Sequence, residues 1–196
     1  MPFIPNFPPA LLEEHRRWHH ANHHTDPSQL PPGYGREFLN FHRQFIAKAL
    51  QWYRQQGYDQ RLVAPWTSVP EGIRSAPCYN RQAEARILNN LQSFATADEL
   101  GLFIEGSNLH GCMHQESARV FGEEMMNDFD TAPESTIFYN IHGMIDNWYK
   151  NWESVSGVHV SGRSQMRGGA ARMKRRPGSA GAGGLRGASA KRGRRK

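Results

Sequence analysis

The chain has 196 residues, of which 38% are hydrophobic and 11% are aromatic. This length suits one domain with a sizeable core. Its two cysteines, Cys78 and Cys112, permit one disulfide but exclude a disulfide-rich scaffold. No stretch approaches the roughly 20 apolar residues that a membrane-spanning helix needs, and no basic-then-apolar signal pattern follows Met1. We therefore expect a cytoplasmic protein without a membrane partner.

Charge is distributed very unevenly along the chain. Residues 161–196 hold 12 of the 24 Lys/Arg and no acid, so the other 12 bases share residues 1–160 with all 18 Asp/Glu. The segment is rich in Gly, Ala, Ser and Arg and nearly devoid of large apolar residues, a composition that cannot bury enough surface to fold. We predict a folded domain over residues 1–156 and a disordered basic tail over residues 157–196.

Apolar periodicity of the helical kind dominates the folded part. Residues 1–10 are rich in proline, and we expect them to form an extended arm. We expect residues 62–80 to be irregular because they are rich in proline and glycine. Strand patterns are weak throughout. We predict an all-α fold with a four-helix-bundle core and irregular loops, with helices near residues 9–24, 36–56, 81–96, 109–126 and 135–152.

Histidines are the chemical signal of this sequence. In LHGCMH (109–114), His110 and His114 are spaced i, i+4, which stacks them on one face of a helix. His142 follows in the aromatic run IFYNIHGMID (137–146), and Cys112 points away from the histidine face. Three imidazoles with a coordination position left open are typical of a reactive metal site, since a closed zinc site normally adds a fourth ligand. The all-nitrogen ligands favour copper, and there is no zinc-finger cysteine pair or Glu-x-x-His repeat.

A second group lies near the N-terminus. The segment HRRWHHANHH (15–24) contains the i, i+4 pairs 15/19, 19/23 and 20/24, and His42 follows in the aromatic run FLNFHR (38–43). One interpretation is a second three-histidine site. The alternative is a solvated polyhistidine helix face and a core-packed His42, which would leave a single half-site.

These motifs resemble those of the type 3 copper proteins, namely tyrosinases, catechol oxidases and haemocyanins. Their second copper site has His-x-x-x-His followed by Phe-aromatic-x-x-His-x-x-x-Asp, as in residues 110–114 and 138–146 here. Their first site has a Phe-Leu-x-aromatic-His-Arg run, which matches residues 38–43. The resemblance covers about residues 11–153. Tyrosinases place another ligand nine residues before the last first-site histidine, where this chain has Gly33.

Arthropod haemocyanins instead use a His-x-x-x-His pair in the first site. The resemblance therefore implies His20 and His24 with His42 at the first copper, with His19 and His23 as the nearest rival pair. It implies two copper ions in all, with His110, His114 and His142 at the second.

The activity that the resemblance implies is oxidation of a small phenol or catechol to a quinone by dioxygen. Phe138, one turn before His142, is expected to line the substrate pocket or to pack in the core. Asp146, one turn after His142, is expected to accept a ring N–H or to bind Arg43, either beside the metal or as a structural ion pair.

Two other functions stay open at this point. One alternative to the oxidase is a degenerate or O2-carrying copper protein without oxidase activity. The other is a protein that acts through its tail. A tail of this kind would bind nucleic acid or an acidic partner weakly and in a salt-sensitive way, because it has arginines but no aromatic residues for base stacking.

Overall fold

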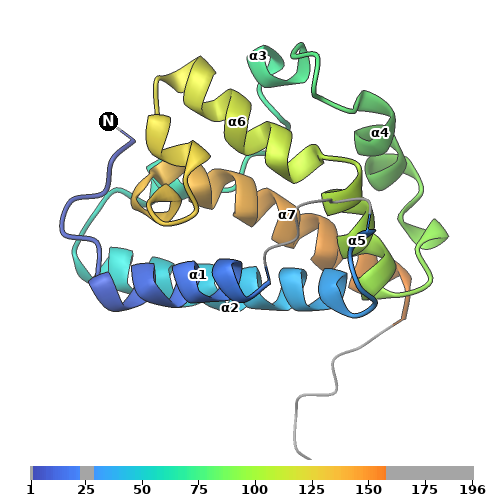
Figure 1. The fold of residues 1–196 in the computed structure, drawn as a ribbon, viewed down its shortest axis with the longest axis horizontal. Helices are drawn as coiled ribbons and strands as arrows, with labels where there is room; N and C mark the ends of the chain where they lie inside the picture. The colour runs from blue at the N-terminus through green and yellow to red at the C-terminus, as the bar shows by residue number, and fades with distance from the viewer. Residues whose placement is uncertain (1, 23–28, 158–196) are drawn as a thin grey trace, which may run out of the picture. The chain divides into compact units, whose positions relative to one another are not determined.

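Helices form the regular structure of the described residues, 2–22 and 29–157, in this computed structural model (Figure 1). In this part of the chain there is no strand beyond one isolated bridge between Phe3 and Ser135, so the all-α prediction is confirmed. The predicted tail from residue 158 onward lies outside the described residues. The longer helices are α1 (Pro9–Ala21), α2 (Tyr34–Gln55), α4 (Arg81–Asn89), α5 (Ala97–Gly106), α6 (Leu109–Phe121) and α7 (Thr136–Val155).

Short turns of helix connect these elements. α3 (Glu71–Arg74) precedes α4, and 3-10 turns occur at Gln60–Val63, Leu91–Ser93, Glu124–Asn127 and Ala132–Glu134. None of the helices in the described residues is long and apolar enough to cross a membrane.

α5 is the helix that the sequence analysis missed. The expected helix over residues 81–96 ends at Asn89, and a new helix begins after Thr96, whose hydroxyl accepts a hydrogen bond from the Glu99 N–H. The Glu99 carboxylate accepts in turn from the Ala95 N–H, a pattern close to a capping box. α5 then packs tightly on α2, because Gly35 and Gly101 meet with no room for a Cβ on either.

α7 is the central helix of the bundle. Nearly its whole length is buried, and it lies between α2 on one side and α6 on the other (Figure 1). The irregular segment after α2 crosses it closely: the Asn140 amide donates to the carbonyls of Leu62 and Ala64, and a Cβ on Gly143 would lie 2.8 Å from the Pro65 ring. These contacts fix the rotation of α7 and so the direction of His142.

The proline-rich N-terminus forms the expected arm over the body. The Ile4 N–H donates to the Glu134 carbonyl, and the Thr136 N–H donates to the Pro2 carbonyl. Ile4 and Phe7 are buried in the core. The arm thereby holds the start of α7 in place.

The two cysteines form a disulfide between Cys78 and Cys112. Cys112 is fully buried on α6, between His110 and His114, and Cys78 lies in the loop before α4. The cysteine thus faces away from the histidines, as expected, and ties α6 to the neighbouring loop.

Candidate metal centre

Two groups of three histidines converge inside the bundle. His15 and His19 of α1 lie with His42 of α2, which we call the α1–α2 set. The α6–α7 set consists of His110 and His114 of α6 and His142 of α7. Within each set the ligand nitrogens all lie within 4.8 Å of one another. Two helices contribute to each set, and the i, i+4 pairs place two imidazoles on one helix face.

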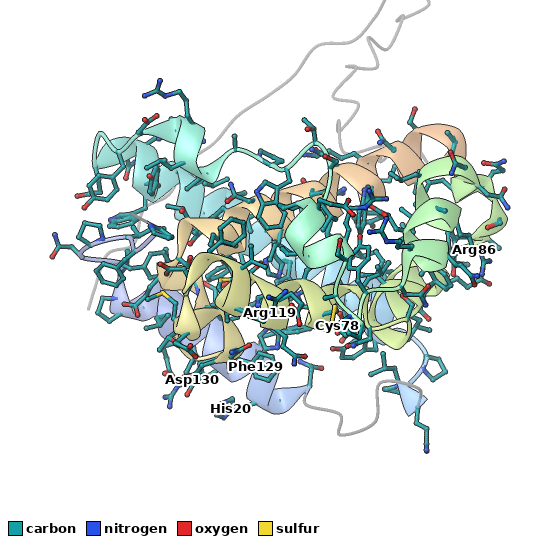
Figure 2. All side chains as sticks on the ribbon, turned by 90° about the horizontal axis from the view of Figure 1, so that it is seen from above. His20, Cys78, Arg86, Arg119, Phe129 and Asp130 are labelled. Carbon is teal, nitrogen blue, oxygen red and sulfur yellow. A yellow bond between two sulfur atoms is a disulfide. The ribbon has the colours of Figure 1, made fainter. Side chains whose placement is uncertain are left out.

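The first set differs from the expected one in its α1 histidines. His20 points away from the bundle, and its Nε2 lies 3.0 Å from the Asp130 carboxylate at the surface. Figure 2 shows His20, Phe129 and Asp130 together at one edge of the molecule. His24 and His23 lie outside the described residues. His15 and His19 take the expected place because α1 turns this face, with Trp18 stacked on Phe41, toward α2.

Hydrogen bonds fix the tautomer of five of the six rings. In these five rings Nδ1 lies 2.7–2.9 Å from an oxygen. The partner is the Phe129 carbonyl for His15, the Phe38 carbonyl for His42, the Met126 carbonyl for His114, the Phe138 carbonyl for His142 and the Glu105 carboxylate for His110. Carbonyl and carboxylate oxygens only accept, so these Nδ1 atoms carry the proton. Each Nε2 is then left with a lone pair directed into the bundle.

The lone pairs face one another at hydrogen-bonding distance. The Nε2 atoms of His110 and His142 are 3.0 Å apart, and those of His19 and His42 are 3.3 Å apart. The Nε2 atoms of His15 and His114, one in each set, are buried without any hydrogen-bond partner. Two nitrogens on one tetrahedral ion at roughly 2.0–2.1 Å would lie about 3.3 Å apart. One cation in each set therefore fits the spacing of the nitrogens. It would also satisfy the buried nitrogens, each of which otherwise costs about 1–3 kcal/mol.

Burial keeps five of the rings, those of His15, His19, His42, His114 and His142, in the neutral form that binds metal. Desolvation lowers the pKa of His15 to about 4 and, as the largest cause, also lowers the pKa of His19, His42, His114 and His142. The charges of neighbouring histidines act in the same direction. Protons therefore compete poorly with a metal for these nitrogens near neutral pH.

The two sets are neighbours in space. The rings of His42 and His142 stack with centroids 4.5 Å apart, so the α1–α2 and α6–α7 sets meet at this pair. Phe138 packs behind both sets, with its ring centroid 3.9 Å from that of His142 and 5.1 Å from that of His15. Phe138 is fully buried and does not line the pocket described next, so of its two expected roles the structure gives it the one in the core.

A pocket of about 360 Å³ reaches both sets from the surface. His19 of one set and His110 and His114 of the other line it. The remaining lining side chains in the described part of the chain are mainly amides and apolar groups: Asn22, Leu30, Tyr34, Glu105, Asn108, Gln115, Met126, Asn127 and Phe129. A molecule of one aromatic ring could reach the histidines through this opening.

Asp146 binds Arg43, the second of the two contacts expected for it, and not a histidine ring. Its carboxylate binds the Arg43 guanidinium and, at 2.6 Å, the Lys150 ammonium. Arg43 also binds Glu153 and lies 4.0 Å over the Tyr149 ring. This network ties α2 to α7 through Arg43, which directly follows His42, and Asp146, one turn beyond His142, so it supports the histidine helices without touching a ring nitrogen.

Sequence reasoning missed two residues that contact the histidines from outside their helices. Glu105, at the end of α5, binds His110 and accepts a hydrogen bond from the Tyr34 hydroxyl. Phe129 stacks on His19 with centroids 4.7 Å apart, and its carbonyl accepts from His15. A carboxylate five residues before a candidate ligand is a weak signal for Glu105, and no local pattern indicates Phe129.

Known proteins offer no guide to this centre. No family model, no curated protein and no solved structure matches the chain.

Proposed function

We propose that this protein is a tyrosinase-like dicopper oxidase that uses O2 to oxidise phenols or catechols to quinones. The observation that carries the proposal is the convergence of two adjacent three-histidine sets on a common interior, with five of the six rings holding their proton on Nδ1. Their resemblance in spacing to the type 3 copper motifs supports it.

The ligand chemistry favours copper over other cations. Magnesium and calcium prefer oxygen ligands, whereas neutral imidazole suits copper and zinc. Neither set contains a carboxylate or a thiolate. Two three-nitrogen sites that meet at one pair of rings suit a reaction shared by two ions better than a structural zinc site, which normally takes four protein ligands.

When bound, the copper pair would supply the electron transfer between substrate and oxygen. Each catechol loses two electrons and two protons to become an ortho-quinone, and one O2 takes four electrons and four protons from two catechols to give two molecules of water. The residues of the chain serve to hold five of the six imidazoles in one tautomer and orientation, through the carbonyls and the carboxylate at Nδ1. Phe138 keeps the interior side of both sets apolar and dry.

Access favours an oxidase over an oxygen carrier. The pocket opens onto histidines of both sets, and its size admits a single ring. A carrier has no need for a passage wider than O2 itself.

Oxygen uptake with a simple catechol tests the proposal. Copper-loaded protein given 4-methylcatechol should consume one O2 for every two quinones formed, as measured with an oxygen electrode and by quinone absorption. His142→Ala should abolish this uptake, whereas His20→Ala, which removes a surface ring, should retain it. Copper-loaded protein with six intact histidines that consumes no oxygen with any catechol would rule out the oxidase.

A further inference from the structure

The charge of the pocket distinguishes substrates that share the same reactive ring. Glu105 is the single charged side chain among the described residues that line it, and no lysine or arginine lies there. The carboxylate is held in place from two sides: Oε1 lies 2.7 Å from His110 Nδ1, and Oε2 accepts from the Tyr34 hydroxyl at 3.3 Å. No cationic lysine or arginine pairs with it in the described part of the chain. Its negative charge therefore acts on whatever occupies the pocket.

The position of Glu105 relative to the histidines sets where that charge is felt. The Nε2 of His110 points into the bundle and its Nδ1 points outward to Glu105. The carboxylate thus lies one imidazole ring and one hydrogen bond farther out than the metal-facing nitrogen. A phenol with its hydroxyl end at the histidines would place its opposite substituent at this depth.

The other walls are suited to an uncharged ring with a polar substituent. Phe129 lines the pocket, and its ring stacks on that of His19. The amides of Asn22, Asn108 and Asn127 also line the pocket and can donate and accept hydrogen bonds without adding charge.

We infer that the preferred substrates are single-ring phenols or catechols whose substituent opposite the hydroxyl end carries a cationic amine, and that Glu105 sets this preference against carboxylate-bearing ones. The inference rests on the proposed oxidase function. The hydroxyl end is the same in every compound of such a series, so differences within the series arise at the far substituent. Charges in a partly enclosed site are screened less than on an open surface, and complementarity of this kind gives specificity.

The test compares three catechols that differ only in the far substituent: a 2-aminoethyl, a methyl and a 2-carboxyethyl group at position 4. For the copper-loaded protein at low ionic strength, kcat/KM should fall in that order, with a ratio of at least about tenfold between the first and the last. Added salt should narrow the ratio.

Two matched variants separate Glu105 from net charge. Glu105→Gln should bring the amine-to-carboxylate ratio close to one, whatever its absolute rate, because only a ratio within one variant is compared. Glu37→Gln, which removes a carboxylate from an exposed position on α2, should keep the wild-type ratio.

The outcomes distinguish this inference from the proposed function. Turnover of all three catechols with equal rates, or with the carboxylate best, overturns the preference but leaves the oxidase standing. If no catechol is oxidised, the oxidase proposal fails, and calorimetric binding of the same three compounds to the cuprous protein under argon still tests the preference. Equal dissociation constants there would overturn it as well.

Discussion

The α6–α7 set is held from more directions than the α1–α2 set. α6 is tied by the Cys78–Cys112 disulfide between its two histidines, Glu105 fixes His110, and α7 is buried along nearly its whole length. α1 lies at the edge of the bundle. Its histidines depend on the stacking of Trp18 on Phe41 and on contacts from Phe129.

This difference predicts an order of metal binding. Ligands that are already in place lose less freedom when they bind an ion, so a preorganised site binds more tightly. We expect the first copper to bind the α6–α7 set and the second to bind the α1–α2 set, with lower affinity.

Loss of His142 should have the largest effect. His142→Ala removes a ligand from the better-held set and the ring that stacks on His42. We expect copper at saturation to fall from two ions per chain to one and catechol oxidation to fall by at least about 100-fold. Metal analysis after dialysis, paired with oxygen uptake, measures both. A variant that keeps two tightly bound ions would show that His142 is not a ligand.

Removal of the disulfide should weaken the fold and one set selectively. The bridge closes a loop of 34 residues, so the double variant Cys78→Ser/Cys112→Ser should lose about 4 kcal/mol of metal-free stability toward urea. Because the bridge lies on α6, the affinity of the tighter copper should fall more than that of the weaker one. Equal losses of copper affinity at both sites would show that the disulfide does not support the α6–α7 set in particular.

Acid should destabilise the metal-free protein. His15, His42 and His142 are neutral in the fold because burial lowers their pKa values, while in the unfolded chain they gain protons near pH 6.5, so the unfolded state binds more protons below that pH. Stability should be full above pH 6.5 and fall as pH drops toward about 4, the pKa of His15. Each such histidine contributes a loss of up to about 1.4 kcal/mol per pH unit. Urea unfolding from pH 7.5 to 4.5 measures it, and His15→Phe should reduce the slope.

The smallest effect is expected at His20. Its ring is exposed and pairs with Asp130 at the surface, so His20→Ala should change stability by less than about 0.5 kcal/mol and leave both coppers bound. His19→Ala, its matched neighbour, should release the weaker copper. The reverse result would restore the ligand set expected from the sequence.

The spacing of residues along the chain predicts much of the fold and part of the histidine site. Helix geometry places His110 and His114 on one face of a helix, and the aromatic run around His142 indicates a second helix. The structure brings these three residues together. The histidine-rich segment of α1 offers several i, i+4 pairs, and spacing does not say which face turns inward. That choice depends on how Trp18 and Phe41 pack between two helices, which is a tertiary fact.

The remaining contacts lie beyond the reach of local patterns. The carbonyls of Met126 and Phe129 fix one histidine in each set, yet a backbone oxygen leaves no mark in a sequence. Glu105 reaches His110 only because α5 ends directly before α6, and the sequence analysis predicts no helix between residues 97 and 108. The Thr96-x-x-Glu99 pattern marks the start of that helix.

Copper stoichiometry, measured together with the absorption of the oxygenated protein, tests the central claim most directly. Two ions per chain, with a near-ultraviolet band that appears when the cuprous protein meets O2 and disappears when O2 is removed, is the predicted result. A saturated protein that binds one copper or none, and shows no such band, would contradict the claim that the two histidine sets form one dinuclear centre.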